Sequence, residues 1–224
     1  MSAKIILAAD TSTAVASFAI AQNKRLLAVL VSYDPAPHSQ TFFGNLQTLL
    51  AQTGLSLAQI DLFTGVIGPG SFTGLRVGLS ALKGLAQAAA RPVLGVNAID
   101  LTTLSTETTG EFIVLLEAGR NEVFAGKRLV NHMGALVQTM PDWVGSPAVL
   151  PERFLSDTTT AFIGSGAVKY LAATDLAGRI VLLATPLART LALHAADLLA
   201  NGTPLELHPY YLRPSDAEIK FANN

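Results

Sequence analysis

Three short apolar runs open the chain, from Lys4 to Ala9, from Val15 to Ala21, and a third that ends at Val31. The residues between them, Asp10 to Thr13 and Asn23-Lys24, are typical turn residues. Short apolar runs bounded by such residues are typical of β-strands. The pattern therefore predicts a three-stranded meander at the start of the chain.

A helical periodicity follows the meander. From His38 to Thr53 apolar residues recur at helical spacing, and Gly54 then favours a helix end. The apolar face of this predicted helix consists of Phe42, Leu46, Leu49 and Leu50. A short apolar run from Asp61 to Ile67 predicts a fourth strand.

The most unusual segment is GPGSFTGLRVG, Gly68 to Gly78, which places glycines at intervals of four at the start of a helical pattern. Gly68-Pro69-Gly70 predicts a turn and Ser71 a helix N-cap, and the helical pattern continues to about Ala90, before Pro92. Each glycine inside a helix costs about 1 kcal/mol relative to alanine. These glycines therefore need a reason other than helix propensity.

Three stripes run along this predicted helix. The first is apolar and suits a protein core: Leu75, Leu79, Leu82 and Ala86. The second is polar: Arg76, Ser80, Lys83 and Gln87. The third is small or apolar: Gly74, Gly78, Ala81, Leu85 and Ala88. Small residues let another backbone approach closely, so two interpretations stay open: tight packing on the chain's own sheet, or contact with a partner helix.

The order of elements recurs about a hundred residues later. The pattern predicts three strands, at Phe112 to Leu116, Val123 to Val130 and Ala135 to Thr139. A helix near Glu152, a strand at Ala161 to Ile163 and a final helix at Pro186 to Ala200 follow them. Both halves follow the order βββαβα, which indicates a duplicated α/β unit. A short strand and helix at Pro92 to Asp100 join the halves, so we predict two domains, residues 1–100 and 101–224.

Composition narrows the functional classes. Hydrophobic residues make up 50% of the chain and charged residues 14%, which suggests that a partner covers part of the surface. A net charge of -1, from 15 basic and 16 acidic residues, is not typical of an independent nucleic-acid binder. The lack of cysteine excludes disulfides and thiolate catalysis. No apolar run reaches the ~18 residues of a membrane span, so we expect a cytoplasmic protein without a membrane partner.

A duplicated unit of this kind resembles the actin, Hsp70 and sugar-kinase superfamily, in which a nucleotide lies between the halves. There the first turn of each half carries a carboxylate that can hold magnesium and a glycine that lets the backbone approach phosphate. Asp10 and Glu117 stand where these acids would be, Gly119 keeps the glycine of the second turn, and Gly164-Ser165-Gly166 after a strand could serve as an adenosine-side loop. The candidate degenerate nucleotide site therefore consists of Asp10, Thr11, Ser12, Glu117, Gly164 and Gly166. Ser12 replaces the first glycine, so ordinary interpretations stay open: Asp10 as a turn cap, Glu117 as a surface acid, and Gly164-Ser165-Gly166 as a strand-to-helix turn.

The sequence gives little support for a metal site, a serine nucleophile or a phosphate-binding loop. His38 is followed four residues later by Phe42 rather than by a second histidine, so we expect it to make a cap or surface contact, and no metal site is predicted. Ser71 does not lie in the Gly-x-Ser-x-Gly motif of serine hydrolases, and the glycine run lacks the Walker lysine. No catalytic residue is predicted.

The chain resembles the TsaB (YeaZ) family over essentially its whole length. The shared motifs are ILAADTSTAVASFAI at the start, HSQ at His38, the run GPGSFTGLRVGLSALKGLA, EAGRNEVF at Glu117, GSGAVKY at Gly164 and PYYLRPSDAEIK at Pro209. The resemblance implies an actin-like ATPase fold, related to ribonuclease H, with an eroded nucleotide site. It also implies a homodimer through the glycine-run helix, replaced on much the same surface by a heterodimer with the catalytic paralogue TsaD.

The function implied by this resemblance is a non-catalytic scaffold that pairs with TsaD, helps recruit the small ATPase TsaE, and acts on tRNA only indirectly. TsaD itself transfers threonylcarbamoyl to the adenosine next to the anticodon. The partner interface is predicted to consist of Gly70, Ser71, Phe72, Thr73, Gly74, Leu75, Arg76, Gly78 and Ala81. No cofactor is expected, except for ATP or ADP with magnesium in the complex. The alternative is an ATPase or small-molecule kinase of the same fold.

Three further expectations are specific to this sequence. Leucine at Gly74 or Gly78 is expected to abolish pairing and to leave the monomer folded. The turn at Glu117 departs from the family's Asp-Ala-Arg because Arg120 stands one place later, and its role stays open. The tail from Pro209 to Lys220 either docks on a partner or packs its aromatic residues on its own domain.

Overall fold

The computed structural model describes residues 4–155, 158–183 and 185–213. These residues form two compact units. The first unit comprises Met1–Leu101 and Thr185–Pro209, and the second comprises Thr102–Ala184 and Tyr210–Asn224. The chain thus passes between the units three times, whereas the pattern along the sequence predicts a single division at residue 100. Among the described residues no helix is long and apolar enough to cross a membrane.

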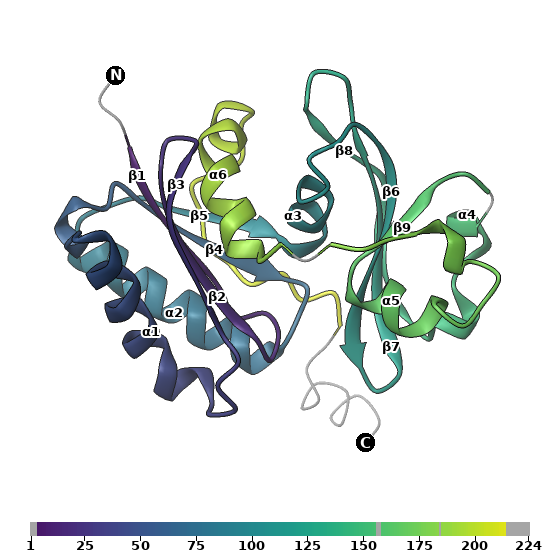
Figure 1. Ribbon diagram of the computed structural model, residues 1–224, viewed down its shortest axis with the longest axis horizontal. Helices are drawn as coiled ribbons and strands as arrows, with labels where there is room; N and C mark the ends of the chain where they lie inside the picture. The colour runs from purple at the N-terminus through teal and green to yellow at the C-terminus, as the bar shows by residue number, and fades with distance from the viewer. Residues whose placement is uncertain (1–3, 156–157, 184, 214–224) are drawn as a thin grey trace. The chain divides into compact units, whose positions relative to one another are not determined.

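A five-stranded sheet with the order β3-β2-β1-β4-β5 forms the centre of the first unit (Figure 1). Its strands are β1 (Ile5–Asp10), β2 (Ala16–Gln22), β3 (Arg25–Ser32), β4 (Leu62–Gly68) and β5 (Val93–Asn97). The first three pair antiparallel, as the predicted meander requires, and β4 and β5 run parallel to β1. The helix α3 (Ala98–Leu104) follows β5.

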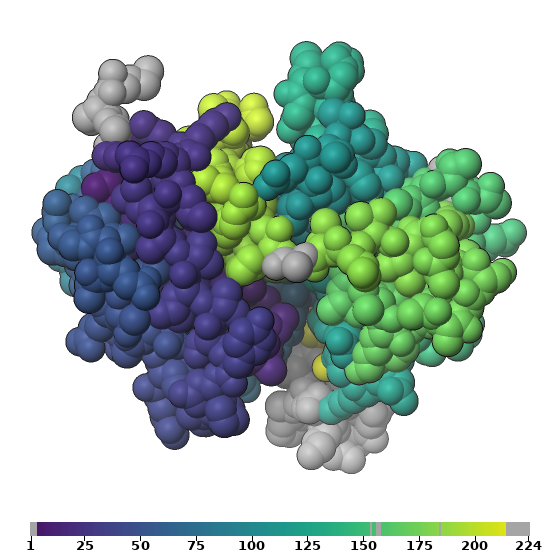
Figure 2. Space-filling view, viewed as in Figure 1, coloured from purple at the N-terminus to yellow at the C-terminus, as the bar shows by residue number. Residues whose placement is uncertain are grey.

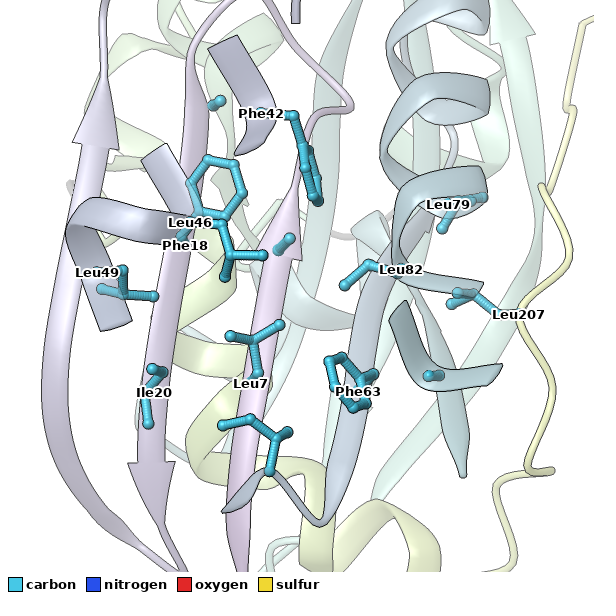
Figure 3. Close-up of a cluster of buried hydrophobic side chains, with 14 of the residues drawn as sticks. Leu7, Phe18, Ile20, Phe42, Leu46, Leu49, Phe63, Leu79, Leu82 and Leu207 are labelled. Carbon is cyan, nitrogen blue, oxygen red and sulfur yellow. The ribbon is translucent and has the colours of Figure 1, made fainter. Parts of the chain in front are cut away.

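The helices α1 (His38–Thr53) and α2 (Phe72–Ala88) lie side by side on one face of this sheet (Figure 1). The bounds of α1 match the predicted ones, and the helix ends at Gly54 with a left-handed backbone. Figure 3 shows the core on this face, where side chains of β1, β2 and β4 meet the two helices. Leu207, from the segment after α6, completes this core. The apolar periodicity of both helices is therefore explained by one shared core.

The opposite face of the sheet is covered by α6 (Leu187–Ala200). Strand β2 presents Ser17, Ala19 and Ala21 on alternate positions to Phe18 and Ile20, which belong to the core under α1 and α2. Small residues on this face let an alanine-rich helix approach the sheet, and its buried residues include Ala188, Ala192 and Ala195. The Oγ of Ser17 accepts a hydrogen bond from the N–H of Ala188 at 3.3 Å. This helix was predicted as the last element of the second half, and that prediction is wrong because α6 packs on the first sheet.

The second unit repeats the arrangement with the strand order β10-β9-β6-β7-β8. Its elements are β6 (Gly110–Gly119), β7 (Glu122–Val130), β8 (Leu136–Gly145), α4 (Glu152–Leu155), β9 (Ala161–Ile163), α5 (Ser165–Leu171) and β10 (Ile180–Val181). Short 3₁₀ turns occur at Leu57–Gln59, Pro147–Val149 and Ala177–Arg179. Each unit thus has a central strand that pairs antiparallel with one hairpin strand and parallel with another. The duplication is confirmed, and α5 is the true second helix of this half.

Candidate functional site

The turn between β4 and α2 is attached to the turn that follows β1. Ser71 Oγ accepts a hydrogen bond from Gly74 N at 3.2 Å, so the predicted N-cap is confirmed. Ser71 N donates to Ser12 O at 2.7 Å, and Thr11 Oγ1 donates to Gly74 O at 2.8 Å. The first turn of α2 is therefore fixed to residues 11 and 12 of the same unit.

This contact explains Gly70, Gly74 and Gly78, the glycines at intervals of four. A Cβ at Gly70 would lie 2.5 Å from Ser12 O, and a Cβ at Gly74 or Gly78 would overlap the carbonyl oxygen or the hydroxyl of Thr11. No side chain larger than hydrogen fits at these positions unless α2 moves away from β1. Packing within the chain is therefore the reason for the glycine spacing.

This finding corrects the predicted partner interface. Gly74, Leu75 and Gly78 are buried inside the first unit, so a partner cannot reach them. Because a Cβ at Gly74 or Gly78 would overlap an oxygen atom of Thr11, we expect leucine there to destabilise the fold of the monomer rather than to leave it intact. The remaining members of the predicted interface are exposed or half-buried: Gly70, Ser71, Phe72, Thr73, Arg76 and Ala81. Arg76 stacks over the Phe72 ring, 3.9 Å from its centroid.

Asp10 acts as a cap of the turn after β1. Its side chain is buried, and Oδ1 accepts a hydrogen bond from Ser12 N at 2.8 Å. Burial raises the pKa of the Asp10 carboxyl above its ordinary value of 3.8, while hydrogen bonds from Ser12 and the nearby His38 lower it in part. The protein therefore disfavours the charged form of this acid.

Asp10→Asn is expected to stabilise the protein near neutral pH. Because the folded-state pKa is raised, the native state loses stability as the pH increases from about 3.8 through that folded-state pKa. Asparagine keeps an acceptor for Ser12 N and carries no charge. Thermal unfolding should show a higher Tm for the variant at pH 7, by about 2–4 °C per kcal/mol regained, and a smaller difference at pH 4.

The matched control for this prediction is Asp34→Asn. Asp34 is exposed, and its Oδ1 accepts from Ala36 N at 2.9 Å in the same local geometry. This variant should leave the Tm unchanged at both pH values. An Asp10→Asn variant that is less stable than the parent at pH 7 would show that the charge of Asp10 is stabilising.

His38 joins the start of α1 to the turn after β1. Its Nε2 lies 2.7 Å from the carbonyl oxygen of Thr13, and because a carbonyl only accepts, Nε2 carries the proton and donates. His38 thus makes the contact predicted for a lone histidine at a helix start. Among the described residues no group of three or more histidines, aspartates or glutamates is placed to hold a metal ion.

The corresponding turn of the second unit is closed by different residues. Gly164 has a φ of 98°, and a Cβ there would lie 2.5 Å from Leu115 O, while Gly166 packs on the same carbonyl group. Ser165 Oγ accepts a hydrogen bond from Glu117 N at 3.1 Å. Lys169 Nζ forms an ion pair with Glu117, and this hydrogen bond raises the pKa of Lys169. Lys169 was not singled out from sequence because helix α5, which carries it, was not predicted.

The two turns therefore do not fit a magnesium nucleotide of the kind bound by the wider superfamily. Thr11 and Ser12 contact the glycines of α2, and Asp10 is buried against Ser12. In the second unit the carboxylate of Glu117 is paired with Lys169. The structure thus brings Asp10 and Ser12 into contact in the first unit, whereas Glu117 of the second unit contacts Ser165 and Lys169.

The outward face of α2 is lined with small residues. They recur at helical spacing and are exposed or, for Val77, half-buried: Thr73, Val77, Ser80, Gly84 and Ala88. A Cβ at Gly84 would meet nothing within 4 Å, and the same is true of Gly44 on the neighbouring helix α1. Helix α1 as a whole lies at the surface of the first unit (Figure 2). Unlike Gly74 and Gly78, these helix glycines have no steric reason within the described residues. An open stripe of small side chains fits the close approach of another helix.

Comparison with known proteins gives one family model, described as TsaD, tRNA N6-adenosine threonylcarbamoyltransferase, which matches residues 35–193. The tRNA threonylcarbamoyladenosine biosynthesis protein TsaB of Haemophilus influenzae is 27% identical over 93% of each chain. An uncharacterized protein of Mycobacterium leprae is 29% identical over 98% of this chain. The aligned region spans only 58% of that relative's length.

Two solved structures establish the fold. YeaZ from Pseudomonas aeruginosa superposes with a TM-score of 0.75 at 25% identity, covering 93% of this chain and 100% of that chain. The activator of the 2-hydroxyisocaproyl-CoA dehydratase from Clostridium difficile, determined with bound ADPNP, gives a TM-score of 0.51 at 10% identity and covers 89% of this chain and 96% of that chain. The predicted actin-like fold with two similar α/β subdomains is thereby confirmed.

Proposed function

The chain belongs to the TsaB (YeaZ) family, within the wider family of the TsaD model, and from this premise we propose that it is a non-catalytic scaffold for threonylcarbamoyladenosine synthesis in tRNA. In this proposal it pairs with a TsaD-type catalytic paralogue and helps recruit a TsaE-type ATPase. TsaD transfers the threonylcarbamoyl group to the adenosine next to the anticodon, and the chain acts on tRNA only indirectly, in the cytoplasm.

The observation that carries the proposal is the outward face of α2. Gly84 costs about 1 kcal/mol in a helix relative to alanine, and the described residues offer no contact that requires a glycine there. A partner helix would explain why glycine stands at this position, if it packs on the stripe of Thr73, Val77, Ser80, Gly84 and Ala88. The exposed part of the originally predicted interface, Thr73 and Arg76, lies on the same helix.

The same face serves both self-pairing and pairing with TsaD in this proposal. The protein alone forms a homodimer, and TsaD replaces one copy. Because one surface cannot contact two partners at once, the two complexes exclude each other. In this proposal a nucleotide with magnesium binds only in the complex with the partners. The reason is that the candidate turns of each half are occupied by contacts with the chain's own atoms.

Co-expression with a TsaD-type paralogue tests the proposal. We expect a stable 1:1 complex on size-exclusion chromatography, and formation of threonylcarbamoyladenosine on tRNA only when the chain, TsaD and TsaE are all present. Calorimetry of the isolated chain with magnesium and ATP addresses the alternative of an ATPase or kinase. Turnover of ATP by the isolated chain, lost on Asp10→Ala, would overturn the scaffold proposal.

A further inference from the structure

The outermost strand of the second sheet, β8, is weakly paired at its centre. In the register of β7 and β8, Ala125 faces Trp143 and Lys127 faces Met140, so two residues of β8, Pro141 and Asp142, lie opposite a single residue of β7. Such a bulge interrupts the ladder of backbone hydrogen bonds, and a proline has no N–H to donate. Strand β8 is also an edge strand in the sheet order, so no other strand of the described residues holds it from the far side.

A buried ion pair lies at the bulge. Arg128 of β7 and Asp142 of β8 are paired at 2.8 Å, and both side chains are only 2% exposed. Transfer of two charged groups from water to the protein interior costs free energy. The ion pair is therefore favourable only when further hydrogen bonds satisfy its remaining polar atoms. Gln138 Nε2 donates to Asp142 Oδ1 at 3.4 Å, a long contact. The other carboxylate oxygen, Oδ2, is reached from the end of the chain.

The C-terminal segment binds at this place. Tyr210 Oη donates to Asp142 Oδ2 at 3.2 Å. Three residues later Arg213 pairs with Glu122, at the start of β7, at 2.8 Å, and both side chains are half-buried, at 26% and 33% exposed. One short segment therefore contacts β7 and β8 together. Of the two interpretations of the tail, its described part fits packing on its own unit, while residues 214–220 lie outside the described residues.

We propose that residues 210–213 form a C-terminal latch that holds the edge strand β8 against β7. The hydrogen bond of Tyr210 gives the buried Asp142 a partner from the C-terminal segment, and the Arg213–Glu122 pair fixes the segment to β7. Side-chain contacts thus replace the backbone hydrogen bonds that the bulge removes. When the latch is detached, β8 loosens and water reaches the Arg128–Asp142 pair. A partner that captures Tyr210 or Arg213 therefore also loosens β8.

Hydrogen exchange of the full chain measured by mass spectrometry tests the latch. The double variant Tyr210→Phe/Arg213→Met removes both polar contacts and keeps the bulk of the side chains. We expect amide exchange in Leu136–Gly145 to accelerate by about tenfold, equivalent to about 1.4 kcal/mol, with exchange in β1 and β2 unchanged. Tyr33→Phe is the matched control, because Tyr33 lies in the first unit and is 79% exposed, and it should not change exchange in β8.

Two truncations locate the effect. Ending the chain after Arg213 keeps the latch and should leave exchange in β8 unchanged, whereas ending it after Pro209 removes the latch and should accelerate exchange as the double variant does. Unchanged exchange in β8 in the double variant would overturn the proposal. Equal acceleration in both truncations would overturn it as well, because it would place the holding contacts beyond residue 213.

Discussion

Leucine in place of Gly74 is expected to unfold the protein. The first side-chain atom would overlap the carbonyl oxygen of Thr11, and this oxygen belongs to the backbone of the turn after β1, so it cannot rotate away. Overpacking in a well-packed core costs about 1–3 kcal/mol, and a clash with backbone exceeds that range. Since single domains are stable by about 5–15 kcal/mol, we expect loss of soluble protein or a denaturation midpoint far below that of the parent.

The graded version of this experiment uses alanine. Gly74→Ala and Gly78→Ala should each lower the free energy of unfolding by about 2 kcal/mol or more, measured by chemical denaturation and circular dichroism. Gly84→Ala is the matched control, because the same methyl group meets open space and removes the helix penalty of glycine. It should raise the free energy of unfolding by about 1 kcal/mol. Equal effects at Gly74 and Gly84 would contradict the packing of α2 on Thr11.

Local signals along the sequence predicted most elements of the first unit. Helix α1 is bounded as predicted because its apolar periodicity and its terminal Gly54 are both local. The cap at Ser71 depends on a residue only three positions away. Strand β10 and helix α5 were missed because two and seven residues are too few to show a period. The position of α6 could not be predicted either, since its sheet is formed by residues more than a hundred positions earlier.

The sequence pattern places the glycines on one face of α2 but does not predict what that face contacts. A helical pattern shows that Gly74 and Gly78 share a face, but it does not show what lies against that face. In the structure Thr11 lies against that face, and its hydroxyl donates a hydrogen bond to the carbonyl oxygen of Gly74, 63 residues later in the sequence. In the same way Glu117 is paired with Lys169, 52 residues later. Both turns thus satisfy their own polar atoms through contacts distant in sequence, which a single sequence does not reveal.

The correction moves the expected interface around α2. The predicted stripe of Gly74, Gly78 and Ala81 is separated from the open stripe of Val77, Gly84 and Ala88 by part of a helical turn. The glycines of this one helix are therefore explained in two different ways. Gly74 and Gly78 let α2 contact Thr11 of its own unit, whereas Gly84 has open space around it, which we propose a partner fills. The two classes can be separated by experiment, because we expect added bulk at Gly74 or Gly78 to destabilise the fold and added bulk at Gly84 to weaken association without destabilising the fold.

Gly84→Leu is expected to leave the protein folded, and even more stable, while it abolishes pairing. Leucine is a better helix former than glycine by somewhat less than about 1 kcal/mol, and a Cβ at this position meets no atom of the described chain within 4 Å. In a complex the same side chain would stand between two helices that approach through small residues. We expect an affinity loss of about 100-fold or more, equivalent to about 2.8 kcal/mol, both for the homodimer and for the complex with TsaD.

Light scattering coupled to size-exclusion chromatography measures self-pairing, and a pull-down with a TsaD-type paralogue measures the heterodimer. Ala196→Leu provides the control, because it adds the same side chain to an exposed position of α6 in the same unit and should leave both complexes intact. If Gly84→Leu is folded and pairs like the parent, the outward face of α2 is not the interface. If it loses self-pairing and keeps TsaD, the two partners use different surfaces, and the proposed exclusion between them fails.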